Sequence, residues 1–296
     1  MEWLVSLRQF IEEYNASFTR DQIQDDRLHS SEREALDRKL MSMNDRSAVI
    51  VNAKVKAKIL ESRSHNKEQE VLYLILRSYL VKQNTKFYVE ESMERRKAII
   101  HNNEIRYDQS LNVEGDINAE HSNLERDPDH APMPRYQYNR LEAVKYAERW
   151  WNSHNTAYRL FENDCTNFIS QCLHAGGAPM RGYPNRSKGW WYQGNNWSYS
   201  WSVANALRWY LSGSKQGLRG EELGSADQLL PGDVICYDFD GDGSWQHNTM
   251  VVAKDEYGMP LVNAHTYNSR MRYWEYTDST AYTPQIKYKF FRVVDG

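Results

Sequence analysis

The chain has 296 residues, 40% hydrophobic and 26% charged, a composition typical of a soluble globular protein with room for two domains. Its formal net charge of −3 excludes the basic field that holds nucleic acid or an anionic membrane. Three cysteines, an odd and small number, argue against a disulfide framework.

The first segment, MEWLVSLRQFIEEYNASF, is predicted to be an amphipathic helix, because its apolar residues recur at helical spacing. A secretory signal needs an unbroken apolar run, and Glu2, Arg8 and Glu12 interrupt this one. No segment reaches the roughly 20 apolar residues that a membrane span requires. We therefore expect a cytoplasmic protein made without export.

Residues 1–110 are predicted to form a small α+β domain. A second helix, SEREALDRKLMSM, opens with a capping-box pattern in which Glu34 follows Ser31. The strand candidates that follow are VIVNAKVKAKILES, EVLYLILRSYLVKQ and KFYVEESMERRKAII, the second of which also fits a helix. We expect solvated histidines in this domain and no catalytic cluster, since its histidines lie among polar neighbours: His29, His65 and His101.

Residues 111–137, with three prolines and little apolar content, are predicted to be a linker. The second domain, residues 138–296, opens with the helix NRLEAVKYAERWWN, for which Asn139 is a plausible N-cap. A further helix, TNFISQCLHA, ends at Gly176-Gly177. From residue 229 onward the pattern predicts an antiparallel sheet.

Cys165 stands where the helix TNFISQCLHA begins. It shares an apolar helix face with Phe168 and Cys172, which suits a buried structural thiol as well as a nucleophile. Position favours the nucleophile, because the positive end of a helix lowers the pKa of a thiol. Asn163 or Asp164 can cap this helix, and we assign Cys172 to packing.

The candidate base for Cys165 is His247, which opens the strand HNTMVVAK. A tight hairpin would place His265 nearly opposite His247, with Asn263 diagonal to it, and either could orient the imidazole. Cys165 with two histidines is also a zinc-ligand set, but the three come from separate segments, without the close spacing of a zinc site. Thiol catalysis therefore ranks above zinc, and a structural core ranks third.

An acidic turn precedes His247 in the segment DFDGDGSW. Asp238, Asp240 and Asp242 match the front half of an EF-hand loop, but Thr249 occupies the twelfth position, where that loop has Glu. We interpret the segment as a Gly-Asp turn that presents His247, and we expect no metal and no cofactor. Calcium binding by the three aspartates is the alternative.

Tryptophan is abundant in the second half of the chain. Trp190, Trp191 and Trp245 are candidates for the walls of a substrate groove. Core packing is an equal interpretation for the loop that carries Trp190 and Trp191.

Several separate motifs occur in order in this half: AVKYAERWWNSHNTAYRLFENDCTNFISQCLHAGGAPM, GWW, SYSW, GDVICYDFDGDGSWQHNTMVV and LVNAHT. Together they resemble the putative amidase domain family of bacterial proteins, which is grouped with NlpC/P60-like and papain-like cysteine hydrolases, over about residues 136–295. The resemblance implies a papain-like fold, in which the Cys helix packs on an antiparallel sheet. It also implies Cys165 as nucleophile, His247 as base and His265 as third member, with Asn263 as a papain-type alternative.

The expected function is hydrolysis of an amide or peptide bond through a thioester. The backbone N–H of Cys165 is the expected oxyanion donor, and the Asn163 side chain is a weaker second candidate. The expected partner is a peptide or amide substrate, of which a peptidoglycan fragment is one class, and no nucleic acid. Two alternatives stay open: a non-catalytic binding module on a papain-like shell, and a Cys/His zinc protein. Family members often act at the envelope, which is the alternative location if a leader has been trimmed.

Overall fold

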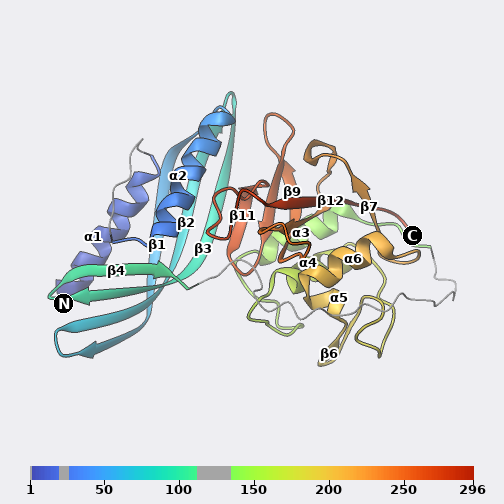
Figure 1. The fold of residues 1–296 in the computed structure, drawn as a ribbon, viewed down its shortest axis with the longest axis horizontal. Coiled ribbons are helices and arrows are strands. Elements are labelled where there is room, and N and C mark those ends of the chain that lie inside the picture. The colour runs from blue at the N-terminus through green and yellow to red at the C-terminus, as the bar shows by residue number, and fades with distance from the viewer. Residues whose placement is uncertain (1, 20–26, 112–134) are drawn as a thin grey trace. The chain divides into compact units, whose positions relative to one another are not determined.

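The computed structural model describes residues 2–19, 27–111 and 135–296 (Figure 1). The chain divides into two compact units. The first holds the residues up to 114 together with 267–271 and 275–282, and the second holds the remainder. Residues 112–134 of the predicted linker lie outside the described part of the chain. No helix in the described ranges is long and apolar enough to cross a membrane.

Two helices open the first unit, α1 (Glu2–Ser17) and α2 (Ser30–Asp45). The N-cap of α2 is His29, whose ring accepts a hydrogen bond from the Ser31 backbone N–H, so the predicted cap at Ser31 is wrong. His29 and His65 are exposed and His101 is half-buried. The two helices bury an apolar core against a sheet, and that core includes Phe10, Leu36 and Val71.

The sheet of the first unit is antiparallel and consists of long hairpins: β1 (Ala48–His65), β2 (Glu68–Gln83), β3 (Lys86–His101) and β4 (Glu104–Ser110). The helical alternative for EVLYLILRSYLVKQ is therefore wrong. Asn66, Asn84 and Asn102 have positive φ in the tight turns, where Asn is among the residues that tolerate it best. A strand from near the C-terminus, β11 (Asn268–Tyr273), pairs with β3 through Asn268–Arg270. This pairing assigns residues 267–271 to the first unit, although the sequence places them in the second domain.

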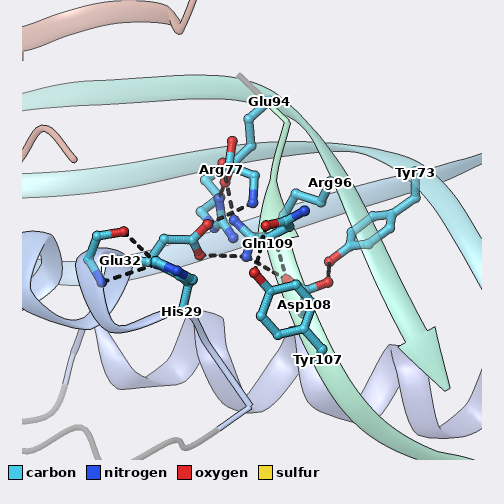
Figure 2. A network of polar contacts seen from close by, with 11 residues as sticks. His29, Glu32, Tyr73, Arg77, Glu94, Arg96, Tyr107, Asp108 and Gln109 are labelled. Atoms are coloured by element: carbon cyan, nitrogen blue, oxygen red, sulfur yellow. Dashed lines mark hydrogen bonds and ion pairs between the residues drawn. The ribbon is translucent and has the colours of Figure 1, made fainter. Parts of the chain in front are cut away.

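A buried network of charged side chains lies in the first unit (Figure 2). Arg96, from β3, binds Glu32 of α2 at 2.6 Å and Asp108 of β4 at 2.5 Å. Tyr73 donates a hydrogen bond to the same Asp108 at 2.6 Å, and Arg77 pairs with Glu94. The network ties one helix to three strands. Each carboxylate of the network has a cationic partner, as buried charges require. Among the described residues, Nε and Nη2 of Arg77 are buried without a hydrogen-bond partner.

The helices of the second unit are α3 (Arg140–Trp150), α4 (Cys165–Ala175), α5 (Tyr199–Ser202), α6 (Ala204–Gly213) and a 3₁₀ turn at Ala226–Gln228. Asn139 caps α3 as predicted, through a 3.2 Å hydrogen bond from Glu142 N–H. Leu141 is exposed, and the buried residues of α3 are Ala143 and Ala147. α4 ends at Ala175 with Gly176 as its C-cap, in agreement with the predicted stop at Gly176-Gly177.

The sheet of the second unit is antiparallel, in the order β10 (Pro260–Ala264), β9 (His247–Lys254), β8 (Val234–Asp238), β12 (Lys287–Val293) and β7 (Gly220–Leu223). A separate two-residue hairpin joins β5 (Tyr192–Gln193) to β6 (Asn196–Trp197). Both units mix helices with antiparallel sheet, as the α+β prediction states. α3 and α4 pack against β9 and β10, so the helix that carries Cys165 lies on the sheet (Figure 1).

Candidate active site

Cys165 is the first residue of α4, and the backbone at this end of the helix is held by a threonine. The hydroxyl of Thr266 accepts hydrogen bonds from the N–H groups of Asp164 and Cys165, at 3.1 and 3.2 Å. Thr266 has a φ of +76°, a conformation that a β-branched residue rarely adopts. The predicted oxyanion donor, the N–H of Cys165, is therefore occupied by a hydroxyl oxygen in this conformation.

The Cys165 side chain is 6% exposed. Burial raises the pKa of its thiol, and a hydrogen bond with Thr166 lowers that pKa by a smaller amount. The sequence-based expectation was a lowered pKa at a helix N-terminus. It is wrong for this conformation, because burial removes the thiolate from water by more than its hydrogen bonds compensate.

Thr166 and Asn248 form a polar link beside the thiol. The Thr166 hydroxyl lies 3.6 Å from Cys165 Sγ and accepts a 3.0 Å hydrogen bond from the Asn248 side-chain N–H. Because Asn248 supplies one donor to that oxygen, the Thr166 proton remains available to the sulfur. The link therefore stabilises a thiolate when one forms.

His265 is held by Asp164, which occupies the N-cap position of α4 without a capping hydrogen bond from its side chain. Its Nδ1 lies 2.7 Å from the Asp164 carboxylate, and its Nε2 lies 2.8 Å from the carbonyl oxygen of Trp150. The ring stacks on Phe168, one turn after Cys165, with 3.9 Å between centroids. The carboxylate of Asp164 thus fixes the orientation of this imidazole, which is the arrangement found in His-carboxylate pairs of hydrolases.

A β-bulge in the hairpin of β9 and β10 decides which side chains share a face. The paired residues are Leu261 with Ala253, Val262 with Val251, and Asn263 with Met250. Val252 is therefore an extra residue in β9, and it shifts the register by one. Because side chains alternate along a strand, His247 lies on the face opposite to that of Asn263 and His265. This register, continued, places Thr266 opposite His247, so His265 lies nearly across from His247 as expected, but the bulge puts the two side chains on different faces.

His247 packs with aromatic residues on its own face of the sheet. Its ring centroid lies 5.7 Å from that of Tyr237 and 6.2 Å from that of Phe239. Burial, with a smaller contribution from the charge of Arg272, lowers the pKa of His247 to about 3. A neutral ring at pH 7 suits a general base, but in the described residues no hydrogen bond joins it to Cys165.

The remaining predicted site residues take structural positions. Asn263 donates a hydrogen bond to Glu148 of α3 at 2.8 Å. Asp164 is the N-cap position of α4, and Asn163 precedes it, half-buried. Cys172 is fully buried, as its packing role requires.

The three predicted groove tryptophans are buried. Trp190 is 0% exposed and donates its indole N–H to Ser170 at 3.0 Å, and Trp191 is 1% exposed and donates to backbone carbonyls. These two side chains pack in the core and do not line an open groove in this conformation. Trp245 is also buried, against α6, where its backbone N–H reaches Asn205 at 3.4 Å.

The residues of the predicted zinc set are not brought together, whereas the three aspartates of the calcium alternative are. His247 lies on the other face from His265, so Cys165 and the two histidines do not form one zinc-ligand set. Within the described residues, Asp238, Asp240 and Asp242 are the one group of three that could hold a metal. The carboxylate of Asp238 accepts the N–H groups of Gly241 and Gly243, which fits the predicted turn.

Thr166, Asn248 and Thr266 contact the first turn of α4, and the sequence pattern singles out none of them. A weak signal exists for each, since Thr166 follows Cys165, Asn248 follows His247 and Thr266 follows His265. Asp164 is identified only as a cap, because its bond to His265 joins residues 101 positions apart.

Comparisons with known proteins identify a family and two relatives for this chain. A family profile described as "Putative amidase domain" matches residues 137–291. The chain is 50% identical over 268 residues to "Uncharacterized protein YhbB" of Bacillus subtilis (strain 168), covering 88% of this chain and 86% of that relative. It is 29% identical over 140 residues to "Uncharacterized protein YjcM" of the same organism, covering 44% of this chain and 31% of YjcM. No solved structure matches the chain.

Proposed function

Because this chain belongs to the family of the "Putative amidase domain", we propose that it hydrolyses an amide or peptide bond with Cys165 as the nucleophile. The family supports a hydrolase of the amidase type, and the thiol mechanism is our own step. The observation that carries this step is the position of Cys165, the first residue of a helix, on the same side as a carboxylate-bound imidazole. A papain-like arrangement is part of the same proposal.

We assign the imidazole of the reaction to His265 in place of His247. Asp164 already orients the His265 ring, which stacks beside Cys165 on α4, whereas His247 lies on the far face of the sheet. To reach the thiol, His265 Nε2 exchanges its bond with the Trp150 carbonyl for one with Sγ. Long or misaligned catalytic contacts are common in ligand-free enzymes.

The reaction then has two halves. Cys165 Sγ attacks the amide carbonyl, its proton passes to His265, and the protonated imidazole gives that proton to the leaving amine. Water hydrolyses the thioester with His265 as base. The oxyanion of each half binds the N–H groups of Asp164 and Cys165 once the Thr266 hydroxyl leaves them.

The test is turnover by the full chain on N-acyl peptides and peptidoglycan fragments. Cys165→Ala should abolish turnover, and mass spectrometry of the wild type should detect an acyl group on Cys165. Cys172→Ala is the matched control, since Cys172 lies on the same helix, is buried and should not be needed for chemistry. Full turnover by Cys165→Ala would contradict the proposal.

Variants of the two histidines distinguish which of them is the general acid and base. His265→Asn should lower kcat by about 100-fold or more, as expected for loss of a general acid and base. His247→Asn should change kcat much less. The reverse ranking would restore His247 as the base and would show that the hairpin rearranges on substrate binding.

A binding module is the second candidate, favoured by the burial of Cys165 and its raised pKa. That function predicts equal affinity of wild type and Cys165→Ala for a peptidoglycan fragment, and no turnover by either. Calorimetric titration of both proteins measures it.

A further inference from the structure

Arg208, on α6, is a buried cation whose N–H groups lack acceptors. The residue is 7% exposed. Its Nε and Nη1 atoms are buried without a hydrogen-bond partner in the described ranges 2–19, 27–111 and 135–296. A guanidinium carries five N–H donors, so this arrangement leaves most of its hydrogen-bonding capacity unused.

What surrounds the guanidinium is aromatic. Its central carbon lies 3.7 Å from the ring centroid of Trp209 and 5.4 Å from that of Trp245. Cation–π contacts offset part of the loss of water, but they supply no acceptor for the N–H groups. Burial lowers the pKa of Arg208, and the charges of Cys236 and Glu222 offset part of that shift without supplying a hydrogen-bond acceptor to Nε or Nη1.

This cation lies on the same side of the sheet as the thiol. The helices α4 and α6, which carry Cys165 and Arg208, contact each other and both contact β9. Cys236 pairs with Asn248, whose side chain contacts Thr166 beside Cys165. Arg208 and Cys165 therefore approach one sheet face, from α6 and from α4.

We propose that Arg208 is a binding site for a carboxylate of the substrate, which places a carboxylate-bearing acyl or amine group beside the amide attacked by Cys165. The planar guanidinium fork matches a carboxylate in two parallel hydrogen bonds. Trp209 and Trp245 form the apolar walls of this site, with ring centroids 3.7 and 5.4 Å from the central carbon of the guanidinium. The substrate class rests on the proposed function, whereas the carboxylate site itself does not.

The direct test uses acetate as the probe and the Cys165→Ala chain as the background, so that no chemistry is involved. Thermal unfolding is measured in sodium acetate and in sodium chloride at equal ionic strength. Acetate should raise the Tm above the chloride value, with saturation in the millimolar range, and Arg208→Met should remove that difference. The proposal is overturned if acetate does not raise the Tm of the chain that retains Arg208, or if it raises the Tm of Arg208→Met equally.

Arg208→Met nearly conserves volume and keeps contact with both indoles, so we expect it to fold. Its Tm in chloride should equal or exceed that of the parent, because an unpaired buried cation is replaced by an apolar side chain. Arg186→Met is the matched control: the Arg186 guanidinium lies 5.1 Å from Trp197 but is exposed, and its loss should preserve the acetate response. Should Arg208→Met fail to fold, Arg208→Lys keeps the charge and should weaken the response about tenfold, since its ammonium lacks the fork.

Turnover supplies the second readout. For a pair of amide substrates that differ only by a carboxylate or a carboxamide, Arg208→Met should raise KM for the carboxylate about tenfold or more. KM for the carboxamide should stay unchanged. If Cys165→Ala retains turnover, the proposed thiol mechanism fails while the acetate result stands. If the Tm increase in acetate is the same with and without Arg208, the carboxylate site is refuted while the thiol mechanism stands.

Discussion

At the scale of single residues, Cys165 is held in a form that resists ionisation. Because burial raises the pKa of its thiol, iodoacetamide at pH 8 should alkylate Cys165 at least tenfold more slowly in the folded chain than in urea. Thr166→Val should slow alkylation further, since it removes the hydroxyl that stabilises the thiolate. Mass spectrometry of the peptide around Cys165 measures both rates. Equal rates for the folded and unfolded chains would show that the thiol is open to solvent.

His247 predicts a pH dependence of folding. Its pKa falls from the ordinary 6.5 to about 3 in the folded chain, so the unfolded state binds the proton first as pH falls. Stability from this group is therefore complete above pH 6.5 and is lost progressively below it. Between pH 6.5 and pH 4, the wild type should lose about 3 kcal/mol more unfolding free energy than His247→Asn.

Denaturant titrations at each pH measure this difference. His65→Asn serves as the control, because His65 is exposed and should titrate alike in both states. An identical pH profile for wild type and His247→Asn would mean that the His247 ring reaches water in the folded chain.

At the scale of elements, the start of α4 and the end of β10 are joined by one buried pair. Asp164→Asn and His265→Asn should each destabilise the chain, and the double variant should lose less than the sum. We expect a coupling of about 1–3 kcal/mol for side chains in direct contact, measured by a double-mutant cycle of unfolding free energies. Additive losses would mean that the pair contributes no interaction energy.

The sequence predicts a feature of an element well where that feature depends only on residues close together in the chain. The cap at Asn139 and the glycine stop at Gly176 depend on neighbouring residues, and both are observed. The face on which His247 lies could not be predicted in the same way. It depends on the extra residue Val252, and a one-residue slip moves every later side chain to the other face. The predicted N-cap of α2 is wrong because His29 supplies the hydrogen-bond acceptor that Ser31 is expected to provide.

At the scale of the whole molecule, each unit is assembled from segments distant in sequence. Arg96 contacts Glu32, 64 residues away, and this pairing has no local signature in the amino-acid pattern. The same holds for β11, which joins β3 from a position more than 160 residues later in the chain. Long-range pairing therefore explains why the charged network and the composition of the first unit were not predicted.

Because segments distant in sequence pair with each other, we predict that the second half of the chain is less stable when it is expressed alone. A fragment of residues 136–296 lacks β3, with which Asn268–Arg270 pairs, and loses the 3.0 Å bond between Arg270 and Glu91. It should unfold at a Tm at least several degrees below that of the full chain and should aggregate through the unpaired β11 edge. Differential scanning calorimetry compares the two. An unchanged Tm would show that β11 contributes little to the second unit.

The bulge at Val252 also has a spectroscopic consequence. It turns the rings of His247 and His265 to opposite sides of one hairpin, so their imidazole proton resonances sense different surroundings. In an NMR titration, a molecule that docks beside α4 should shift the His265 signals and leave those of His247 nearly unmoved. Two side chains eighteen residues apart thus provide a built-in pair of reporters for the side from which a ligand arrives.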